Sequence, residues 1–151
     1  MPILQEQKSV TRLSREKTVF RGAHVYNPAT HHSREHSMAQ QLPVIKTDPL
    51  YILLREGNIK AFNERKAKGE KADLMGADFQ RVDLRGIDAD GLDLSNCYFR
   101  TCDLRGLNLT KAKLEGASIH GAQISGTYFP PQLDPEEITL SFLHGTRMRY
   151  K

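Results

Sequence analysis

The centre of the chain repeats every five residues. Read in fives from Ala72, residues 72–131 give twelve uninterrupted frames. The third position of a frame is Leu, Phe or Ile in eleven of the twelve, with Ala89 as the exception, and Gly ends seven frames. A fixed period over this length indicates a repeat protein, in which each unit buries its apolar residues against its neighbours.

Two other architectures do not fit this period. Apolar residues of an amphipathic helix recur at three and four, and the seven glycines would destabilise a helix. A leucine-rich repeat needs a unit of at least about 20 residues with an Asn ladder, which the chain lacks. The five-residue unit therefore decides the fold class.

The frames resemble the pentapeptide-repeat family, whose consensus is Ala, then Asp or Asn, then Leu, followed by two variable residues. Asp or Asn fills the second position in seven of the twelve frames. The resemblance implies an all-β fold, a right-handed quadrilateral β-helix in which each pentapeptide makes one side and four make a coil. Its first and third residues would point inward, and twelve frames would make a solenoid of about three coils.

Stacking every fourth frame is consistent with this arrangement. The inward columns are apolar almost throughout, as an interior closed to water requires. One column widens from Ala89 to Phe129, which predicts that Phe129 helps to close the C-terminal end. Cys97 and Cys102 fall at small inward positions, so we expect buried, inert thiols.

Helices are expected before the repeats, in a cap over residues 48–71. Asp48 is a suitable N-cap with Pro49 at the first helical position, and Gly57 ends this helix. Asn58 can cap a second helix that ends at Gly69. The two helices predict an αα-hairpin over the first coil.

A further cap is expected after the repeats, in residues 132–151. Asp134 and Glu137 have the spacing of a capping box, with Pro135 between them, and a short helix over 135–143 follows. The alternation of apolar residues from Ile138 would also suit a strand. Such C-terminal elements often serve as caps or dimer contacts in pentapeptide-repeat proteins, which leaves a homodimer open.

The N-terminal residues 1–47 are expected to be a basic flexible tail. They hold seven Lys or Arg against three acids, which accounts for the whole formal charge of +4. Four residues of this tail form an apolar and basic cluster typical of a linear binding motif: Phe20, Arg21, Val25 and Tyr26. The alternatives to a binding motif are a flexible leader and a strap that folds back onto the repeats. His31, His32 and His36 lie in a polar stretch, and we expect no metal there.

The second, fourth and fifth positions of each frame face outward. Arg85 and Arg105 fall one coil apart on one side, and Arg81 and Arg100 lie on the preceding side, with His120 above Arg100. This predicts an arginine patch for an acidic protein surface or a phosphate. The alternative is a solvated face of mixed charge, since aspartates lie among the arginines.

No catalytic motif is present, and we expect a protein without enzymatic activity and without a cofactor. Glu115, Ser118 and His120 would lie on two different sides and in solvent, so they do not form a triad. No apolar run has the length of a membrane helix or a secretory signal, which predicts a cytoplasmic protein.

These observations favour a non-catalytic adaptor that binds another protein or protein complex through its repeat face and N-terminal tail. The alternative is an inhibitor or protector of a DNA-processing enzyme, because some pentapeptide-repeat proteins are similar to DNA in shape and bind type II topoisomerases. The near balance of eight acids and six bases in residues 72–131 argues against DNA mimicry. Binding of nucleic acid by the tail is a third, less favoured possibility.

Overall fold

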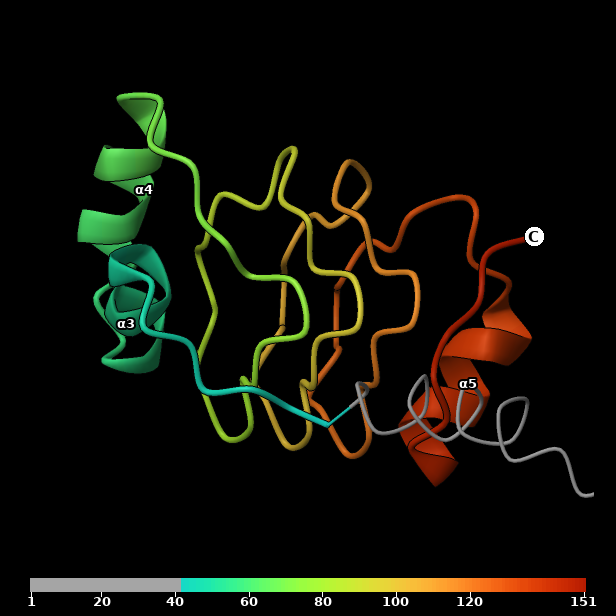
Figure 1. Ribbon diagram of the computed structural model, residues 1–151. Coiled ribbons are helices and arrows are strands. Elements are labelled where there is room, and N and C mark those ends of the chain that lie inside the picture. Colours follow the sequence, from blue (N-terminus) through green and yellow to red (C-terminus); the bar gives the residue numbers. More distant parts are fainter. Residues whose placement is uncertain (1–41) are drawn as a thin grey trace, which may run out of the picture. The chain divides into compact units, whose positions relative to one another are not determined.

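The repeats form a stack of coils with helices at both ends. The structure, a computed structural model, describes residues 42–151. In this part α3 (Pro49–Arg55) and α4 (Ile59–Ala67) precede the repeats, and α5 (Pro135–His144) follows them. Figure 1 shows the coils between the α3–α4 pair and α5. We call residues 72–131 the coil stack.

Neighbouring coils pair in parallel at a separation of 20 residues. Single-residue bridges join Asp78 to Tyr98, Tyr98 to Ser118, and Asp83 to Asp103. Backbone bonds flank each bridge: the Phe79 N–H donates to the Tyr98 carbonyl at 2.8 Å, and the Tyr98 N–H donates to the Ala77 carbonyl at 3.0 Å. A register of 20 residues places four pentapeptides in each coil.

The expectation of an all-β fold, a quadrilateral β-helix, is wrong. The described residues contain three α-helices and no strand or sheet, and the coils are joined only by isolated bridges. The reason is the length of each side. A corner turn takes the third, fourth and fifth residues of a frame and the first of the next, so only the second residue lies between turns and no run of paired residues forms.

The corner turn explains the glycines. At each corner the N–H of a first residue donates to the carbonyl three residues earlier, as from Ala77 to Leu74 at 3.0 Å and from Val82 to Phe79 at 3.1 Å. The fifth residue of the frame is then the third residue of the turn, and it has positive φ throughout the stack except at Lys111 and at the final frame. Glycine adopts this conformation without steric cost, which is why it ends seven frames.

The second position explains the aspartates. The Asp78 carboxylate accepts the N–H of Gln80 at 2.8 Å, and Asp103 accepts that of Arg105 at 3.1 Å. The same bond recurs in four other frames, in which a side-chain oxygen accepts the N–H of the residue two positions later: Asp83, Asp88, Asp93 and Asn108. These are Asx turns, which satisfy the N–H of the fourth residue. Asp or Asn at the second position is therefore part of the corner and not only a surface charge.

The interior is apolar and continuous. Within residues 77–122 every first and third residue of a frame is buried, as expected for inward positions, and Ile124 is partly buried. The rings of Phe79 and Phe99 stack one coil apart, with centroids 5.3 Å apart and planes 3° from parallel. Phe129 is partly buried against the same core. Together these residues form the core of the described part.

The first coil is covered by α3, α4 and the segment before them. The helices begin where the sequence predicts: Asp48 caps α3 by accepting the N–H groups of Leu50 and Tyr51, and Asn58 caps α4. The Tyr51 hydroxyl donates to the Asp78 carbonyl at 2.6 Å, and its ring meets Phe79 edge-on.

Side chains and a short segment also satisfy the open backbone edge of this coil. The Asn63 side chain donates to the Gly86 carbonyl and accepts the N–H of Asp88, both at 2.9 Å. Val44, from the segment predicted as a tail, bridges Ala77 in parallel. The edge is therefore paired by side chains and a strap in place of a preceding coil.

The last coil is covered by α5 and the residues that follow it. The Gly116 N–H donates to the Met148 carbonyl at 2.7 Å and the Met148 N–H to the Ala117 carbonyl at 2.9 Å, so Met148 stands where a further coil would lie. The Ser141 hydroxyl accepts the N–H of Ile119 at 3.0 Å. The helix alternative for residues 135–143 is confirmed, with one further residue.

The capping box expected at α5 does not form. Asp134 makes no side-chain cap hydrogen bond. The carboxylate of Asp134 pairs instead with Lys151, and Glu137 binds both the backbone N–H and the guanidinium of Arg149. The C-terminal residues return along the helix, with an antiparallel bridge between Leu133 and Tyr150. Their backbone and cationic side chains bind the two carboxylates that the capping box would have used.

Thr101 offers a test of the corner turn. Its φ is 53°, although it is β-branched and sits where most frames have glycine. We expect Thr101→Gly to raise the free energy of unfolding by roughly 0.5–1 kcal/mol. The substitution relieves the steric strain of a β-branched residue in the left-handed region, and the larger conformational entropy that glycine loses on folding offsets only part of this gain. Chemical denaturation measures this. Gly121→Thr, the reverse change one coil along at φ 63°, should destabilise; a less stable Thr101→Gly protein would contradict the strain argument.

The two thiols give a second test. Both side chains are fully buried, and burial raises the pKa of Cys97 and of Cys102 to about 12. Their Sγ atoms donate to the Leu74 and Val82 carbonyls. We expect neither thiol of the native protein to react with a disulfide reagent near pH 8, because thiolate is scarce and access is closed. Both should react in denaturant. Rapid modification of the native protein would show that the interior opens.

Candidate functional site

Arg81 and Arg100 are the two unpaired cations of the coil stack. Their backbones meet across the coils, since the Arg81 N–H donates to the Arg100 carbonyl at 3.1 Å. Both side chains are exposed, and neither forms an ion pair with a described residue. Arg81 has positive φ, at 61°. The structure thus brings these two predicted site residues together on one side of the stack.

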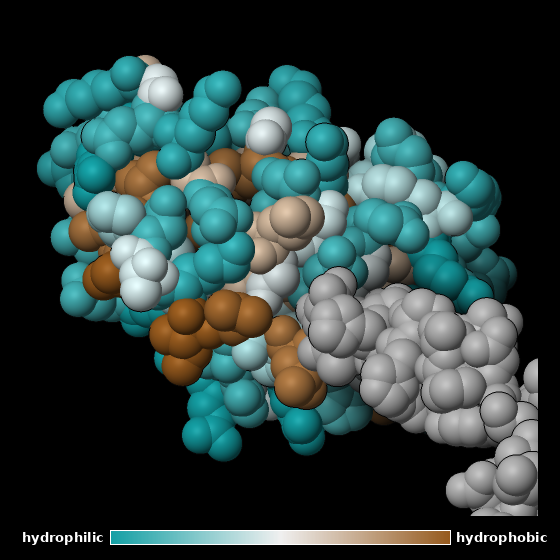
Figure 2. All heavy atoms as spheres, viewed as in Figure 1, coloured by the Kyte–Doolittle hydropathy of each residue, from teal (hydrophilic) through white to brown (hydrophobic). Residues whose placement is uncertain are grey.

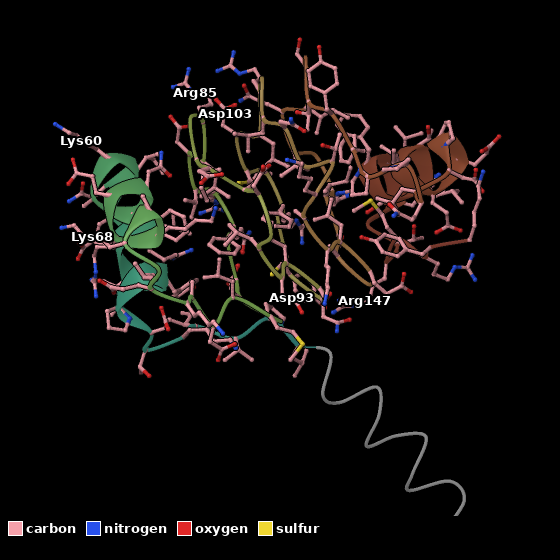
Figure 3. All side chains as sticks on the ribbon, turned by 90° about the horizontal axis from the view of Figure 1, so that it is seen from above. Lys60, Lys68, Arg85, Asp93, Asp103 and Arg147 are labelled. Carbon is pink, nitrogen blue, oxygen red and sulfur yellow. The ribbon has the colours of Figure 1, made fainter. Side chains whose placement is uncertain are left out.

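Arg85 and Arg105 are bound to aspartates. Arg105 contacts Asp103 at 2.6 Å and Arg85 contacts Asp83 at 2.7 Å, each also bonding through Nε. Arg85 reaches Asp103 as well, with Nε 3.3 Å from a carboxylate oxygen. Figure 3 shows Arg85 and Asp103 together at one edge of the stack. These two arginines are therefore part of a charge ladder within the protein.

The ladder is neutral and changes the titration of its members. The hydrogen bond from Arg105 lowers the pKa of the Asp103 carboxyl to about 2, and that from Arg85 lowers the pKa of Asp83. The other cations of the stack, Lys111 and Lys113, pair with Asp90 and Asp93. The predicted patch of four arginines thus divides into two neutralised members and two that keep free charge.

The predicted tail residues Phe20, Arg21, Val25 and Tyr26 lie outside the described residues, as do His31, His32 and His36. Within residues 42–151 no group of three His, Cys, Asp or Glu side chains is arranged to hold a metal ion. None of the described helices is long and apolar enough to cross a membrane.

Apolar side chains gather on the segment that leads into α3. Leu42 is 69% exposed and Ile45 is 72% exposed, with Val44 and Met75 about half exposed beside them. Figure 2 shows this apolar surface among hydrophilic side chains. This surface was not predicted, because no periodicity marks Val44 and Ile45 and both belong to the segment expected to be a tail.

Sequence reasoning also placed Ser118 and His120 in solvent, which is wrong. Ser118 is only 4% exposed and its hydroxyl donates to the Gly145 carbonyl at 3.1 Å. His120 is half-buried, and its ring packs against Gly145. Both residues occupy outward positions, but the chain after α5 covers them. The last coil has no following coil to pair with its backbone edge, and this open edge could have predicted that the C-terminal residues cover Ser118 and His120.

Comparison with known proteins agrees with the repeat geometry. The family model described as pentapeptide repeats matches residues 93–129, in eight copies. No curated protein and no solved structure matches the chain. The Asx turns, corner turns and buried positions continue from this segment into the frames before it.

The coil stack thus defines the chain as a repeat protein, built from one short unit stacked in register. The unit is the pentapeptide repeat, and the resemblance seen in the sequence is confirmed for residues 93–129.

The charge ladder can be tested by acid titration. We expect Asp103→Asn to lower the free energy of unfolding at neutral pH by up to about 1 kcal/mol, the upper range for surface ion pairs. Asn keeps the Asx turn, as Asn108 does in the same position, so the change isolates the charge.

The pH dependence has a defined sign. Because the pKa of Asp103 is about 2 in the folded protein and about 3.8 without partners, its ionised form stabilises the fold above about pH 4 and loses this effect as the pH falls to about 2. The difference between Asp103→Asn and the parent should vanish over that range. Asp93→Asn, whose partner is 3.9 Å away, should show little effect. A pH-independent difference at Asp103 would refute the ion-pair explanation.

Proposed function

We propose that the protein is a non-catalytic adaptor that binds an acidic surface of another protein through Arg81 and Arg100. One observation carries the proposal: of the six Lys and Arg in residues 72–131, these two have no carboxylate partner among the described residues. An exposed guanidinium without an internal partner is available to a carboxylate of another molecule. Arg85 and Arg105 flank this pair, but Asp83 and Asp103 already neutralise them.

The rigidity of the stack supports this role. Arg100 is anchored between two coils, with its carbonyl accepting from Arg81 and the next residue donating to the His120 carbonyl at 2.9 Å. Charges held on a rigid frame lose little conformational entropy on binding. The left-handed backbone at Arg81 and at Thr101, on either side of Arg100, is a further mark of a constrained surface.

The N-terminal tail is the second proposed contact. Its cluster of Phe20, Arg21, Val25 and Tyr26 combines apolar anchors with a basic residue, as linear motifs do. A tail and a rigid face on one chain can bind the same partner with an affinity above that of either alone. Whether the partner is a single protein or a complex does not affect the chemistry proposed.

Inhibition of a DNA-processing enzyme is supported less well. A duplex mimic presents rows of free negative charge, whereas five aspartates of the stack pair with cations of the stack or of α4: Asp83, Asp88, Asp90, Asp93 and Asp103. Their carboxylates also hold Asx turns at most of these positions. The second-position aspartates are thus already used within the protein.

Two double variants of equal charge test the proposal. Full-length protein, Arg81→Gln/Arg100→Gln and Arg85→Gln/Arg105→Gln would each serve as bait in affinity capture with cross-linking mass spectrometry. We expect the first variant to lose the partner, with at least about tenfold weaker binding when the recovered protein is titrated, since two charge-assisted contacts are removed. The second should stay within about threefold, because its arginines are already neutralised.

Cross-links should join acidic segments of the partner to the side of the stack that carries Arg100. Equal losses in both double variants would mean that general charge, and not the unpaired arginines, attracts the partner. Capture unaffected by either variant would show that this face is not the contact, and the N-terminal tail would then be the remaining proposed contact.

A further inference from the structure

A pocket of about 280 Å³ lies where the second and third coils meet the end of α5. Six residues line it: Tyr98, Arg100, Ser118, His120, His144 and Gly145. They come from two coils and from the helix end, which are far apart in the sequence. Only Arg100 belongs to the interaction surface proposed above.

The walls of this pocket are fixed by hydrogen bonds. The Ser118 hydroxyl donates to the Gly145 carbonyl, and the Gly121 N–H donates to the Phe142 carbonyl at 3.1 Å. Gly145 ends α5 with φ of 70°, and a Cβ on it would lie 3.4 Å from Cβ and Cγ of His120. Glycine therefore allows both the left-handed helix end and the close approach of the His120 ring.

His120 presents a donor to the pocket. Its Nδ1 is the one buried side-chain nitrogen or oxygen without a hydrogen-bond partner among the described residues. A buried N–H without a partner is rarer in proteins than an unpaired acceptor. In the neutral ring the proton is therefore assigned to Nε2, and this N–H can donate a hydrogen bond to a ligand or to solvent.

The other polar side chains of the pocket include further donors. Arg100 carries a guanidinium with no ion pair to a described residue, and the His144 imidazole lies in the last turn of α5. Arg147 stacks its guanidinium over the Tyr98 ring at 4.4 Å from the centroid and bonds the Tyr98 hydroxyl. This places a further cation beside the pocket.

Among residues 42–151 no carboxylate side chain lines the pocket, and its negative part is the partial charge of the α5 C-terminus. The nearest acid in the column of Tyr98 and Ser118 is Asp78, one coil toward α3, whose carboxylate accepts the N–H of Gln80. The carbonyls of the helix end that face the stack, at Phe142 and Gly145, are both occupied by donors from it. The described lining of the pocket is thus rich in hydrogen-bond donors.

We infer that this pocket binds an oxyanion, a phosphate or a carboxylate group, between the Arg100 guanidinium and the imidazoles of His120 and His144. A guanidinium offers paired N–H donors that match two oxygens of such a group, and the imidazoles supply donors from the other side. This anion site needs no partner protein, so its test does not depend on the proposed adaptor function.

The test is a titration of the isotope-labelled full chain, followed by NMR at constant pH and ionic strength. Inorganic phosphate and acetate are the two probes, which separate a phosphate site from a carboxylate site, and sodium chloride is the blank. We expect saturable shifts of the His120 and His144 ring signals with at least one probe. Arg100→Gln should weaken that binding by about tenfold, the effect of losing one charge-assisted pair of bonds.

Arg81→Gln is the matched control, because Arg81 is also an exposed, unpaired arginine but does not line the pocket. It should bind the probe within about twofold of the parent. His144→Gln, which keeps a polar side chain at the helix end, should weaken binding as Arg100→Gln does. Thermal unfolding would confirm that all three variants keep the parent fold.

Two results would overturn the inference. One is an absence of saturable shifts at His120 and His144 with both probes. The other is equal weakening by Arg81→Gln and Arg100→Gln, which would indicate attraction by surface charge without a defined pocket.

Discussion

The corner turn is the constraint on which the described part of the protein depends. One hydrogen bond closes each turn, from the first residue of a frame to the third residue of the frame before, and at nearly every corner the fifth position has a left-handed backbone. This geometry directs the first and third residues inward and leaves the second free to pair with the next coil. The period of five, the apolar core and the register of 20 residues all follow from it.

The same turn determines the character of the surface. An aspartate at the second position accepts the N–H of the fourth residue, so the repeat draws carboxylates to its sides for a structural reason. Cations elsewhere on the stack then pair with these carboxylates, as Arg85 and Arg105 do. Arg100 keeps its charge unpaired in a frame that has Tyr98 at the second position, whereas Arg81 does so although Asp78 stands in its own frame. The consensus residues therefore do not by themselves decide which arginines are neutralised.

The sequence was sufficient for the features that local chemistry controls. Inward residues such as Phe99, and the helix starts at Asp48 and Asn58, follow from spacing and capping preferences and are found as predicted. The all-β class was not correct, because five-residue sides are too short for strands between their turns. The unused capping box and the burial of Ser118 depend on where residues 141–150 dock, which no local pattern encodes. For the four arginines, the repeat frame predicts the outward positions but not which two are neutralised.

The two ends of the stack solve the same problem by different means. At the first coil, short polar side chains such as Asn63 bond directly to the open edge. At the last coil the chain must turn back from α5, and the left-handed Gly145 makes that turn against His120. The pocket lies beside this turn and is lined in part by outward residues of the coils. Those positions supply Arg100 and His120, so the closure of the last coil places hydrogen-bond donors around the pocket.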